Sequence, residues 1–326
     1  MIITRTPLRI TLGGGGTDLP SYYRRFGGSL IAAAINKYIF ISLNRTFTPG
    51  YLLKYSELER VDKINQIDHD IIREVLRAHE LEPALELVSV ADIPTGTGLG
   101  SSGAFTVGLL RAVYAQRREH VASADLAEEA CRIEIDVLGR AVGKQDQYIA
   151  AFGGLTCFDF EKDGTVQVSP LRLSNETMLD LEEHLLMFFT RFSRSAEGVL
   201  HDQKIRSESE DTAMLENLHV VKRLGIESRH ALEKGDTTGF AELMLEHWEY
   251  KKSRSQGMSN GDIDRWYQAA VDAGAIGGKL VGAGGGGFLL FYTRNPTEVR
   301  QAMAAEGLEE LRFAFDHDGS TVLART

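Results

Sequence analysis

The feature that most constrains this chain is a glycine-rich segment at residues 94–103, which reads PTGTGLGSSG. It follows an alternating segment typical of a strand, residues 85–90, and precedes a segment with helical periodicity. The backbone N–H groups of such a loop and the N-terminus of the next helix together form a favourable anion site. We call residues 94–103 the phosphate loop, because they predict binding of the phosphates of a nucleotide.

The phosphate loop matches neither of the two commonest nucleotide motifs. A Walker A loop ends in Gly-Lys-Ser or Gly-Lys-Thr, whereas this loop runs Gly100-Ser101-Ser102 with no lysine. In a dinucleotide fingerprint counted from Gly96, the third glycine would fall at Ser101. The chain therefore binds phosphates in another way, or the loop is only an unusually glycine-rich turn.

A second glycine cluster, residues 13–16, follows the β-branched segment 2–12 and is flanked by Arg9 and Asp18. Four consecutive glycines carry an entropic cost that an ordinary turn does not require, and they allow another molecule to approach the backbone closely. A flexible turn is the alternative interpretation.

A third cluster lies at residues 277–287, and its part 282–287 matches Gly-x-Gly-x-x-Gly. A strand-like segment, 288–292, follows it instead of the helix that would receive a pyrophosphate. A nucleotide-dependent oxidoreductase is therefore the weakest of the functions we consider.

Hydrophobic periodicity predicts both strands and helices. We expect strands at residues 2–12, 38–43, 85–90, 155–160, 288–292 and 311–315, and helices at 103–119, from Ser123 onward, and over most of 208–272. Ser123 is the expected N-cap of its helix. A polar turn at residues 162–164 indicates a domain boundary, so we expect an N-terminal domain at 1–160 and an α+β domain at 161–326 that pack closely together.

Length and charge limit the possible partners. The chain has 326 residues, enough for two domains, and 36 basic against 46 acidic residues give a net charge of −10. This charge does not favour nucleic acid or an anionic membrane surface. Cys131 and Cys157 have neither metal-ligand nor disulfide-framework spacing, and no segment resembles a signal peptide or membrane span. We expect a cytoplasmic protein with small-molecule partners.

In their order and positions, the three glycine clusters resemble those of the GHMP kinases, the family of galactokinase, homoserine kinase, mevalonate kinase and phosphomevalonate kinase. Residues 7–9 and 14–18, together with the segment GKQDQY at 143–148, look most like the D-glycero-D-manno-heptose 7-phosphate kinase branch, which phosphorylates an anomeric hydroxyl. The resemblance implies an α+β fold of two domains, the first similar to ribosomal protein S5 domain 2, with the active site between them.

The resemblance also implies ATP and Mg²⁺ as cofactors. The residues that would hold ATP are those of the phosphate loop, namely Pro94, Gly96, Thr97, Gly98, Leu99, Gly100, Ser101, Ser102 and Gly103. Mg²⁺ would be bound by Ser102 and Glu134, since this ion prefers oxygen ligands and keeps several waters. The helical pattern places Glu134 beside a buried stripe, where it could instead be a solvated surface residue.

By the same resemblance, Asp146 would accept or orient the proton of the attacking hydroxyl, and Arg9 would stabilise the charge that develops. A helix cap is the alternative role for Asp146, and a surface ion pair is the alternative for Arg9. The expected sugar-binding residues are Arg9, Gly14, Gly15, Gly16, Thr17, Asp18, Asp146, Arg194, Ser195, Gly284 and Gly285.

A substrate that already carries a phosphate needs basic partners. The second domain offers Arg194, Lys251, Lys252 and Arg254, although the run at Lys251 is also typical of a solvated helix face. Histidines, including His69 and His247, show no metal-ligand spacing and are expected to be ordinary residues.

The implied function is transfer of the γ-phosphate of ATP to the C1 hydroxyl of a higher-carbon sugar phosphate, first of all D-glycero-D-manno-heptose 7-phosphate, giving the 1,7-bisphosphate. An octose 8-phosphate kinase of an antibiotic pathway and a fucose- or galactose-type 1-kinase remain open. A non-catalytic homologue that senses sugar and ATP is a further alternative, against which Ser102, Glu134 and Asp146 argue. Residues 50–70, with Tyr51 and Tyr55, are a possible adenine pocket, and the protein is expected to be a monomer or homodimer.

Overall fold

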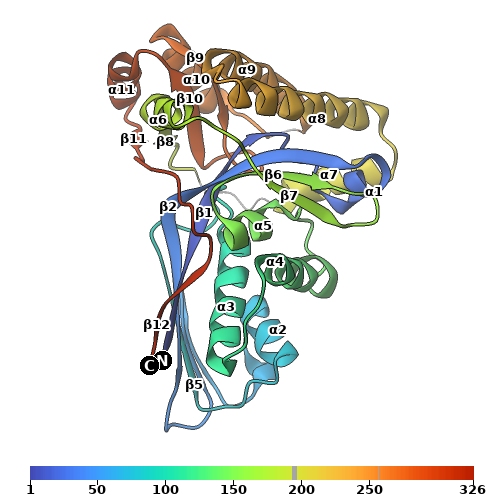
Figure 1. The fold of residues 1–326 in the computed structure, drawn as a ribbon, viewed down its shortest axis with the longest axis vertical. Helices are drawn as coiled ribbons and strands as arrows, with labels where there is room; N and C mark the ends of the chain where they lie inside the picture. The colour runs from blue at the N-terminus through green and yellow to red at the C-terminus, as the bar shows by residue number, and fades with distance from the viewer. Residues whose placement is uncertain (193–196, 256) are drawn as a thin grey trace.

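The computed structural model describes residues 1–192, 197–255 and 257–326 of the chain. Within these ranges the backbone forms two sheets, one in each half of an elongated molecule, and the two chain ends lie side by side (Figure 1). No helix of the described ranges is long and apolar enough to cross a bilayer.

The larger sheet contains, among the described residues, eight strands in the order β12-β1-β2-β5-β3-β4, with β6 paired to β2 and β7 paired to β6. They are β1 (Ile2–Gly13), β2 (Gly28–Arg45), β3 (Tyr51–Lys54), β4 (Leu58–Val61), β5 (Leu85–Ala91), β6 (Leu155–Phe160), β7 (Val166–Pro170) and β12 (Thr321–Arg325). β2 pairs with β6 through its first part and with β5 through its second part. The register of β1 against β2 shifts between Pro7 and Leu8, where a proline without an N–H is tolerated.

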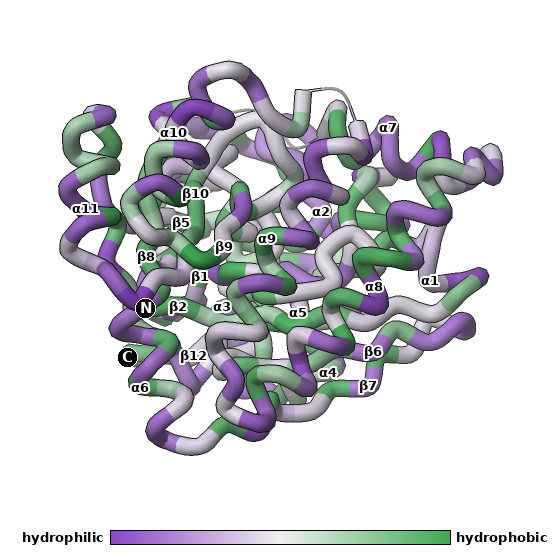
Figure 2. The backbone as a smooth tube through the Cα atoms, turned by 90° about the horizontal axis from the view of Figure 1, so that it is seen from above, coloured by the Kyte–Doolittle hydropathy of each residue, from purple (hydrophilic) through white to green (hydrophobic). Residues whose placement is uncertain are grey.

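Helices cover one face of this sheet (Figure 1). They are α2 (Asp70–Ala78), α3 (Ser101–Arg117), α4 (Ser123–Cys131) and α5 (Gln145–Phe152), with a 3₁₀ turn η1 (Ile64–Gln66) and a π-helical turn η2 (Arg132–Val137); α1 (Pro20–Phe26) follows β1. α3 contacts β1, β2, α2, α4 and α5, and it is therefore buried on most sides. Figure 2 shows hydrophobic residues concentrated along the central strands, with hydrophilic stretches on the outer helices.

The smaller sheet has the order β11-β8-β10-β9 in the described part of the chain. Its strands are β8 (Leu185–Phe189), β9 (Ala275–Leu280), β10 (Phe288–Thr293) and β11 (Glu309–Glu310). The helices of this half are α6 (Asn175–His184), α7 (Glu197–Glu208), α8 (Thr212–Glu233), α9 (Thr237–Arg254), α10 (Gly261–Asp272) and α11 (Pro296–Ala305). This half is α+β, as predicted.

The two halves pack directly against each other, as the sequence indicates. One buried hydrophobic cluster includes Leu8 of β1, Phe240 of α9 and Leu290 of β10. The glycine loop after β1 lies on α8 so closely that a Cβ added to Gly225 would be 2.8 Å from Gly14 Cα. This close packing joins the halves without a tether.

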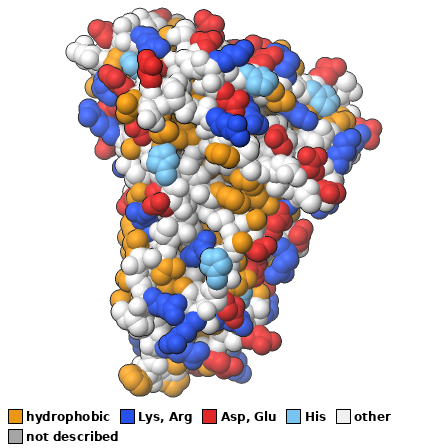
Figure 3. Space-filling model, in the orientation of Figure 1, with side chains coloured by type: hydrophobic (Ala, Val, Ile, Leu, Met, Phe, Trp, Pro, Cys, Tyr) orange, Lys and Arg blue, Asp and Glu red, His pale blue; other side chains and the backbone are white. Residues whose placement is uncertain are grey.

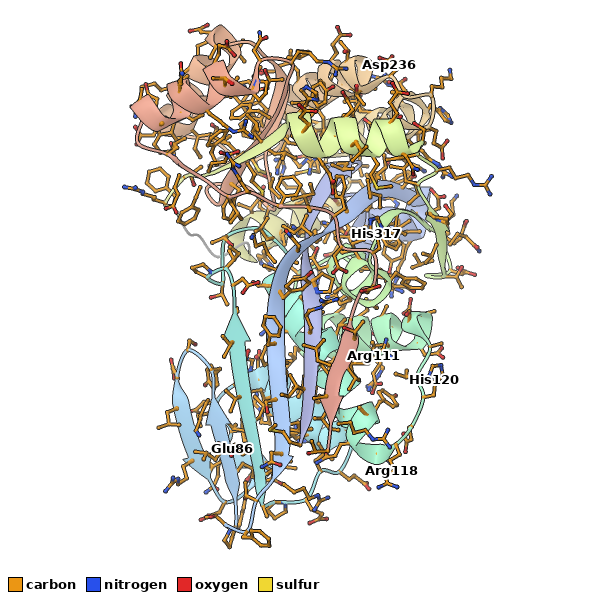
Figure 4. All side chains as sticks on the ribbon, turned by 60° about the vertical axis from the view of Figure 1, so that its left-hand side comes forward. Glu86, Arg111, Arg118, His120, Asp236 and His317 are labelled. Atoms are coloured by element: carbon orange, nitrogen blue, oxygen red, sulfur yellow. The ribbon has the colours of Figure 1, made fainter. Side chains whose placement is uncertain are left out.

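The larger sheet does not end at residue 160, where the sequence predicts the domain boundary, because β7 and β12 both pair into it. In Figure 4, His317 marks the segment that runs from the smaller-sheet half back to β12, and Asp236 marks the far end of that half, where it caps α9. We propose that the first domain comprises the chain through β7 together with β12.

Two local predictions are wrong. Residues 311–315 do not form a strand. The short strand of this region is β11, at Glu309–Glu310, and after it Phe315 makes only an isolated bridge with Ile35 of the larger sheet. Ser123 does not cap its helix; it is the first helical residue, and the N-cap is Ala122, without a side-chain hydrogen bond.

Candidate active site

A cavity of about 1160 Å³ opens between the two halves, and all three glycine clusters contribute to its wall. Two of the clusters touch: a Cβ added to Gly98 of the phosphate loop would lie 3.1 Å from Gly282 Cα. Both glycines have a φ of +83°, a left-handed conformation that other residues rarely adopt. The three clusters thus line one cavity between the two halves, where the resemblance places the active site.

The phosphate loop leaves the first turn of α3 open toward the cavity. Its Gly96, Gly98 and Gly100 all have positive φ, and Gly100, the N-cap of α3, provides no side-chain cap. The backbone N–H groups of the first turn therefore remain available for an anion.

Not every predicted phosphate-loop residue faces the cavity. Those that line it are Pro94, Gly96, Gly98, Gly100, Ser101 and Ser102, joined by Thr95. Thr97 and Leu99 are buried and hold the loop, through hydrogen bonds from Thr97 Oγ1 to Pro94 O (2.9 Å) and from Arg9 N to Leu99 O (3.0 Å). Gly103 makes room for the neighbouring helix α5, since a Cβ there would lie 2.7 Å from Asp146 Cβ.

Arg9 and Asp146 form an ion pair at the base of the cavity. Arg9 Nε and Nη2 each lie 2.8 Å from Asp146 Oδ1, and Arg9 Nη1 donates to Gly98 O. Arg9 is 5% exposed, so this is not a surface ion pair. Asp146 is not a helix cap either: it lies in the first turn of α5, whose N-cap is Lys144. Asp146 Oδ2 has no hydrogen-bond partner among the described residues and is open to an incoming hydroxyl.

Asp18 is buried next to this pair. Its Oδ1 accepts a hydrogen bond from Gly16 N and its Oδ2 accepts one from Gln145 N, both 3.2 Å long. Burial raises the pKa of Asp18, and the nearby Asp146 carboxylate raises it further. A carboxyl group held in this way can accept or donate a hydrogen bond to a sugar hydroxyl.

The rest of the loop after β1 divides into two sets. Gly15 and Gly16 line the cavity. Gly14 lies against the backbone of Ser29, and Thr17 donates to Gly14 O (2.9 Å) and Ser29 O (3.0 Å). Gly14 and Thr17 therefore position the loop, although the sequence predicts them as sugar ligands.

Ser102 and Glu134, the predicted metal ligands, lie together at the start of α3. Ser102 Oγ donates to Glu134 Oε2, and Gln147 Nε2 donates to Glu134 Oε1 over 2.8 Å. Glu134 lies in the π-helical turn η2 and is 1% exposed, so it is not a solvated surface residue. Burial raises its pKa.

Arg140, which no sequence motif predicts, contacts the same two residues. Its Nη1 lies 2.8 Å from Ser102 Oγ and 3.4 Å from Glu134 Oε2, while its Nη2 lies 2.8 Å from both carboxylate oxygens of Asp70. No group of three or more His, Cys, Asp or Glu side chains able to hold a metal occurs in the described part of the chain. One hydroxyl and one carboxylate are nevertheless the kind of donor set that Mg²⁺ uses when phosphates and waters complete its shell.

The third glycine cluster begins in strand β9, and its part 281–287 is the loop of a β-hairpin between β9 and β10, closed by the Val281 N–H to Phe288 O bond of 2.8 Å. No helix follows it, so the dinucleotide interpretation is excluded here. Gly284 lines the cavity, whereas Gly285 holds the hairpin by donating to Met258 O (3.1 Å).

Four basic residues of the second half, His247, Lys251, Arg254 and Lys279, also line the cavity. Lys251 and Arg254 are buried, which corrects the alternative of a solvated helix face. Lys252 lies outside the cavity and pairs with Glu249 at 2.8 Å. The predicted ligands Arg194 and Ser195 lie outside the described residues.

Three aromatic residues, Tyr55, His69 and Phe105, line one part of the cavity, which we call its aromatic end. The sequence predicts an adenine pocket only within the broad range 50–70. His69 stacks on Phe105 with ring centroids 5.0 Å apart, and the Tyr55 ring meets His69 edge-on at 4.8 Å. Tyr51, by contrast, is buried in the core and donates to Leu81 O. Aromatic residues in the sequence were the only available signal for this end.

Comparison with known proteins identifies the family. Residues 67–154 match the GHMP kinases N terminal domain, and residues 228–308 match the GHMP kinases C terminal domain. A Campylobacter jejuni protein named D-glycero-alpha-D-manno-heptose 7-phosphate kinase is 32% identical, covering 98% of this chain and 97% of its own.

Solved structures agree as well. The structure of a D-glycero-D-manno-heptose 1-phosphate kinase from Bacteroides thetaiotaomicron is 27% identical and superposes with a TM-score of 0.80 over 100% of both chains. A Lactococcus lactis galactokinase with galactose, 18% identical with a TM-score of 0.76 over 99% of this chain and 95% of that one, shares the fold. The three glycine loops, the paired Arg9 and Asp146, and these full-length matches lead to one conclusion: the chain belongs to the GHMP kinase family and is a phosphotransferase that acts on a hydroxyl group.

Proposed function

We propose that the protein transfers the γ-phosphate of ATP to the anomeric C1 hydroxyl of a higher-carbon sugar phosphate, with D-glycero-D-manno-heptose 7-phosphate as substrate and the 1,7-bisphosphate as product. The observation that carries the proposal is the Arg9–Asp146 pair, which lies in the same cavity as the open N-terminus of α3. The heptose in the names of two relatives supports the choice of sugar.

In this proposal the phosphates of ATP lie on the phosphate loop, and the aromatic end with Tyr55, His69 and Phe105 receives the adenine. Ser102 and Glu134 fit Mg²⁺ because a hydroxyl and a carboxylate oxygen lie side by side next to that loop. When bound there, Mg²⁺ would neutralise charge on the phosphates.

Asp146 Oδ2 accepts the proton of the C1 hydroxyl while the sugar oxygen bonds to the γ-phosphorus and the bond from that phosphorus to ADP breaks. The guanidinium of Arg9 holds Asp146 in place and stabilises negative charge on the transferring group. Asp18, Gly15 and Gly16 orient the sugar hydroxyls, because they line the cavity beside Asp146.

An ADP-release assay with ATP, Mg²⁺ and a panel of acceptors tests this function. The panel contains heptose 7-phosphate, heptose 1-phosphate, an octose 8-phosphate, fucose and galactose, and phosphorus NMR identifies the product. We expect a new anomeric phosphate signal with heptose 7-phosphate and none from Asp146→Asn, which serves as a control for contaminating kinases.

Preference for the octose phosphate or for an unphosphorylated sugar would assign the protein to another branch of the same reaction. No turnover of any acceptor, with ATP still bound, would reject the kinase proposal in favour of a sugar- and ATP-sensing homologue.

A further inference from the structure

A group of buried cations forms the wall of the cavity that belongs to the second half. Lys251 and Arg254 lie on α9 three residues apart, so they share one face of the helix, and Lys279 lies on the adjacent strand β9. Their exposed fractions are 8%, 4% and 3%. On the face drawn in Figure 3, by contrast, acidic and basic side chains are interspersed.

None of these three cations has a carboxylate within ion-pair distance in the described part of the chain. Their partners are neutral oxygens and, for Lys279 Nζ, also His247 Nδ1 at 3.5 Å. Lys251 Nζ donates to Leu280 O (2.7 Å) and to Gly282 O, and Lys279 Nζ donates to Leu12 O (2.7 Å). A buried cation without an anion is strongly unfavourable, because it has lost its hydration without a compensating charge.

Arg254 is the least satisfied of the three. Its Nε donates to Asn217 Oδ1 (3.1 Å) and its Nη1 to Gly15 O (3.3 Å). Its Nη2 is buried and has no hydrogen-bond partner among the described residues. An anion next to Arg254 would satisfy this donor and supply the missing charge together.

The lowered pKa values of these groups are consistent with a binding site for an anion. Burial lowers the pKa of Lys279 to about 7, and the charge of Arg254 lowers it further. Burial lowers the pKa of Arg254 to about 10, against the opposing effect of the Asp18 carboxylate, which is not within ion-pair distance. Burial, followed by repulsion from Lys279 and Arg254, also lowers the pKa of Lys251. The charge of a bound dianion would raise these pKa values.

The position of the cluster points to the sugar and not to the nucleotide. Arg254 contacts Gly15 O, and Gln203 Nε2 donates to Gly16 O over 2.9 Å, so both side chains meet the loop that also carries Asp18. The phosphates of ATP have their own site at the N-terminus of α3, on the other half of the molecule.

We propose that Arg254, Lys251 and Lys279 bind the phosphate group that the acceptor sugar already carries. This inference rests on the proposed function, and it explains how the site would select its substrate. An unphosphorylated sugar would leave the three cations unpaired, and a site whose buried polar groups are left unpaired rejects the incomplete ligand strongly.

The test compares D-glycero-D-manno-heptose 7-phosphate with D-glycero-D-manno-heptose as acceptors for the wild type and Arg254→Gln. Loss of a hydrogen bond to a charged group should raise KM for the phosphorylated sugar about 10- to 100-fold. KM for ATP and kcat/KM for the unphosphorylated sugar should change little. Lys252→Gln is the matched control, since it removes the same charge two residues away but outside the cavity.

Calorimetric titration of each sugar without ATP separates this inference from the proposed function. Weaker binding of the phosphorylated sugar alone in Arg254→Gln supports the phosphate site even if the wild type shows no turnover. Equal losses for both sugars would overturn the inference in favour of a structural role, and a raised KM for ATP would assign the cluster to the nucleotide. If Arg254→Gln has a lowered Tm, Arg254→Lys and Lys279→Met provide the same comparison.

Discussion

The two walls of the cavity differ in whether their buried cations are paired with carboxylates. On the wall built by the first half, Arg9 pairs with Asp146, and Arg140 pairs with Asp70 and Glu134. On the wall built by the second half, Lys251, Arg254 and Lys279 have no carboxylate within ion-pair distance among the described residues, and their partners are neutral oxygens and the His247 ring. The cations of the first wall are paired with carboxylates in the free protein, whereas those of the second wall gain an anionic partner only when a ligand binds.

In our proposals the first wall carries the residues that react, and the second wall carries the residues that recognise the sugar phosphate. Reacting groups work best when they are already oriented, and the hydrogen bonds of Arg9 to Asp146 and Gly98 provide that orientation. A group that recognises an anion gains most when its charge is uncompensated in the free protein, because binding then relieves an unfavourable state. Each of the following predictions changes one wall and asks whether the other is affected.

The largest effect is expected for Asp146→Asn, which leaves Arg9 without its anion and so makes the first wall resemble the second. We expect kcat to fall by about 10²- to 10⁴-fold, the usual contribution of a general base, while ATP binding is nearly retained. Steady-state ADP release and calorimetric ATP binding measure the two quantities. Asp136→Asn, at an exposed position on η2, is the control, and a variant that keeps more than about a tenth of the wild-type rate would contradict the role of Asp146.

Ser102→Ala should have a smaller effect, confined to the metal. It removes the hydroxyl that contacts Glu134 and Arg140, so the Mg²⁺ concentration for half-maximal activity should rise about tenfold, equivalent to roughly 1.4 kcal/mol of binding free energy. Ser101→Ala removes the same atoms one residue earlier and should not shift the Mg²⁺ titration. An unchanged titration for Ser102→Ala would show that Ser102 is not a metal ligand.

The last prediction concerns the second wall and is a pH dependence of stability, which is measured on unfolding and not on activity. In the folded protein the pKa of Lys279 is about 7, below its value of about 10.4 in an unfolded chain, so the unfolded state binds more protons between these values. The contribution of Lys279 to the free energy of unfolding should therefore increase as pH rises from 7 to 10.

Thermal melts of the wild type and Lys279→Met across this pH range measure the contribution, since methionine does not titrate. The difference in Tm, wild type minus variant, should increase as pH rises. Saturating sugar phosphate should make this increase smaller. Parallel curves for the two proteins would show that Lys279 is not destabilised by its surroundings.

The elements that were predicted well are those with strong local patterns. The β-branched segment at 2–12, the segment at 155–160 and the apolar segment at 288–292 are all strands. The elements that were not predicted are those whose secondary structure depends on neighbouring strands and not on the local sequence. Ala32 to Ala34 continue strand β2 despite the low strand propensity of alanine, because β1 and β6 flank them.

The site shows the same division. The phosphate loop was predicted from adjacent residues, and Asp146 from the family resemblance of the segment 143–148. Arg140 was not, because its partner Asp70 lies 70 positions earlier, and Lys279 was not, because its partner Leu12 O lies 267 positions away. His247, expected to be ordinary, lines the cavity beside Lys279 for the same reason.

By itself, the sequence determined the three glycine loops, since positive φ angles at positions such as Gly98 and Gly282 depend on the residue type, and it determined the order of strands and helices around them. Only the tertiary structure decided which charges are paired. Arg9 and Arg254 are the same residue type in sequence, yet one lies 2.8 Å from a carboxylate and the other beside neutral oxygens. The strength of an ionic interaction depends on distance and burial, and packing sets both across the whole chain.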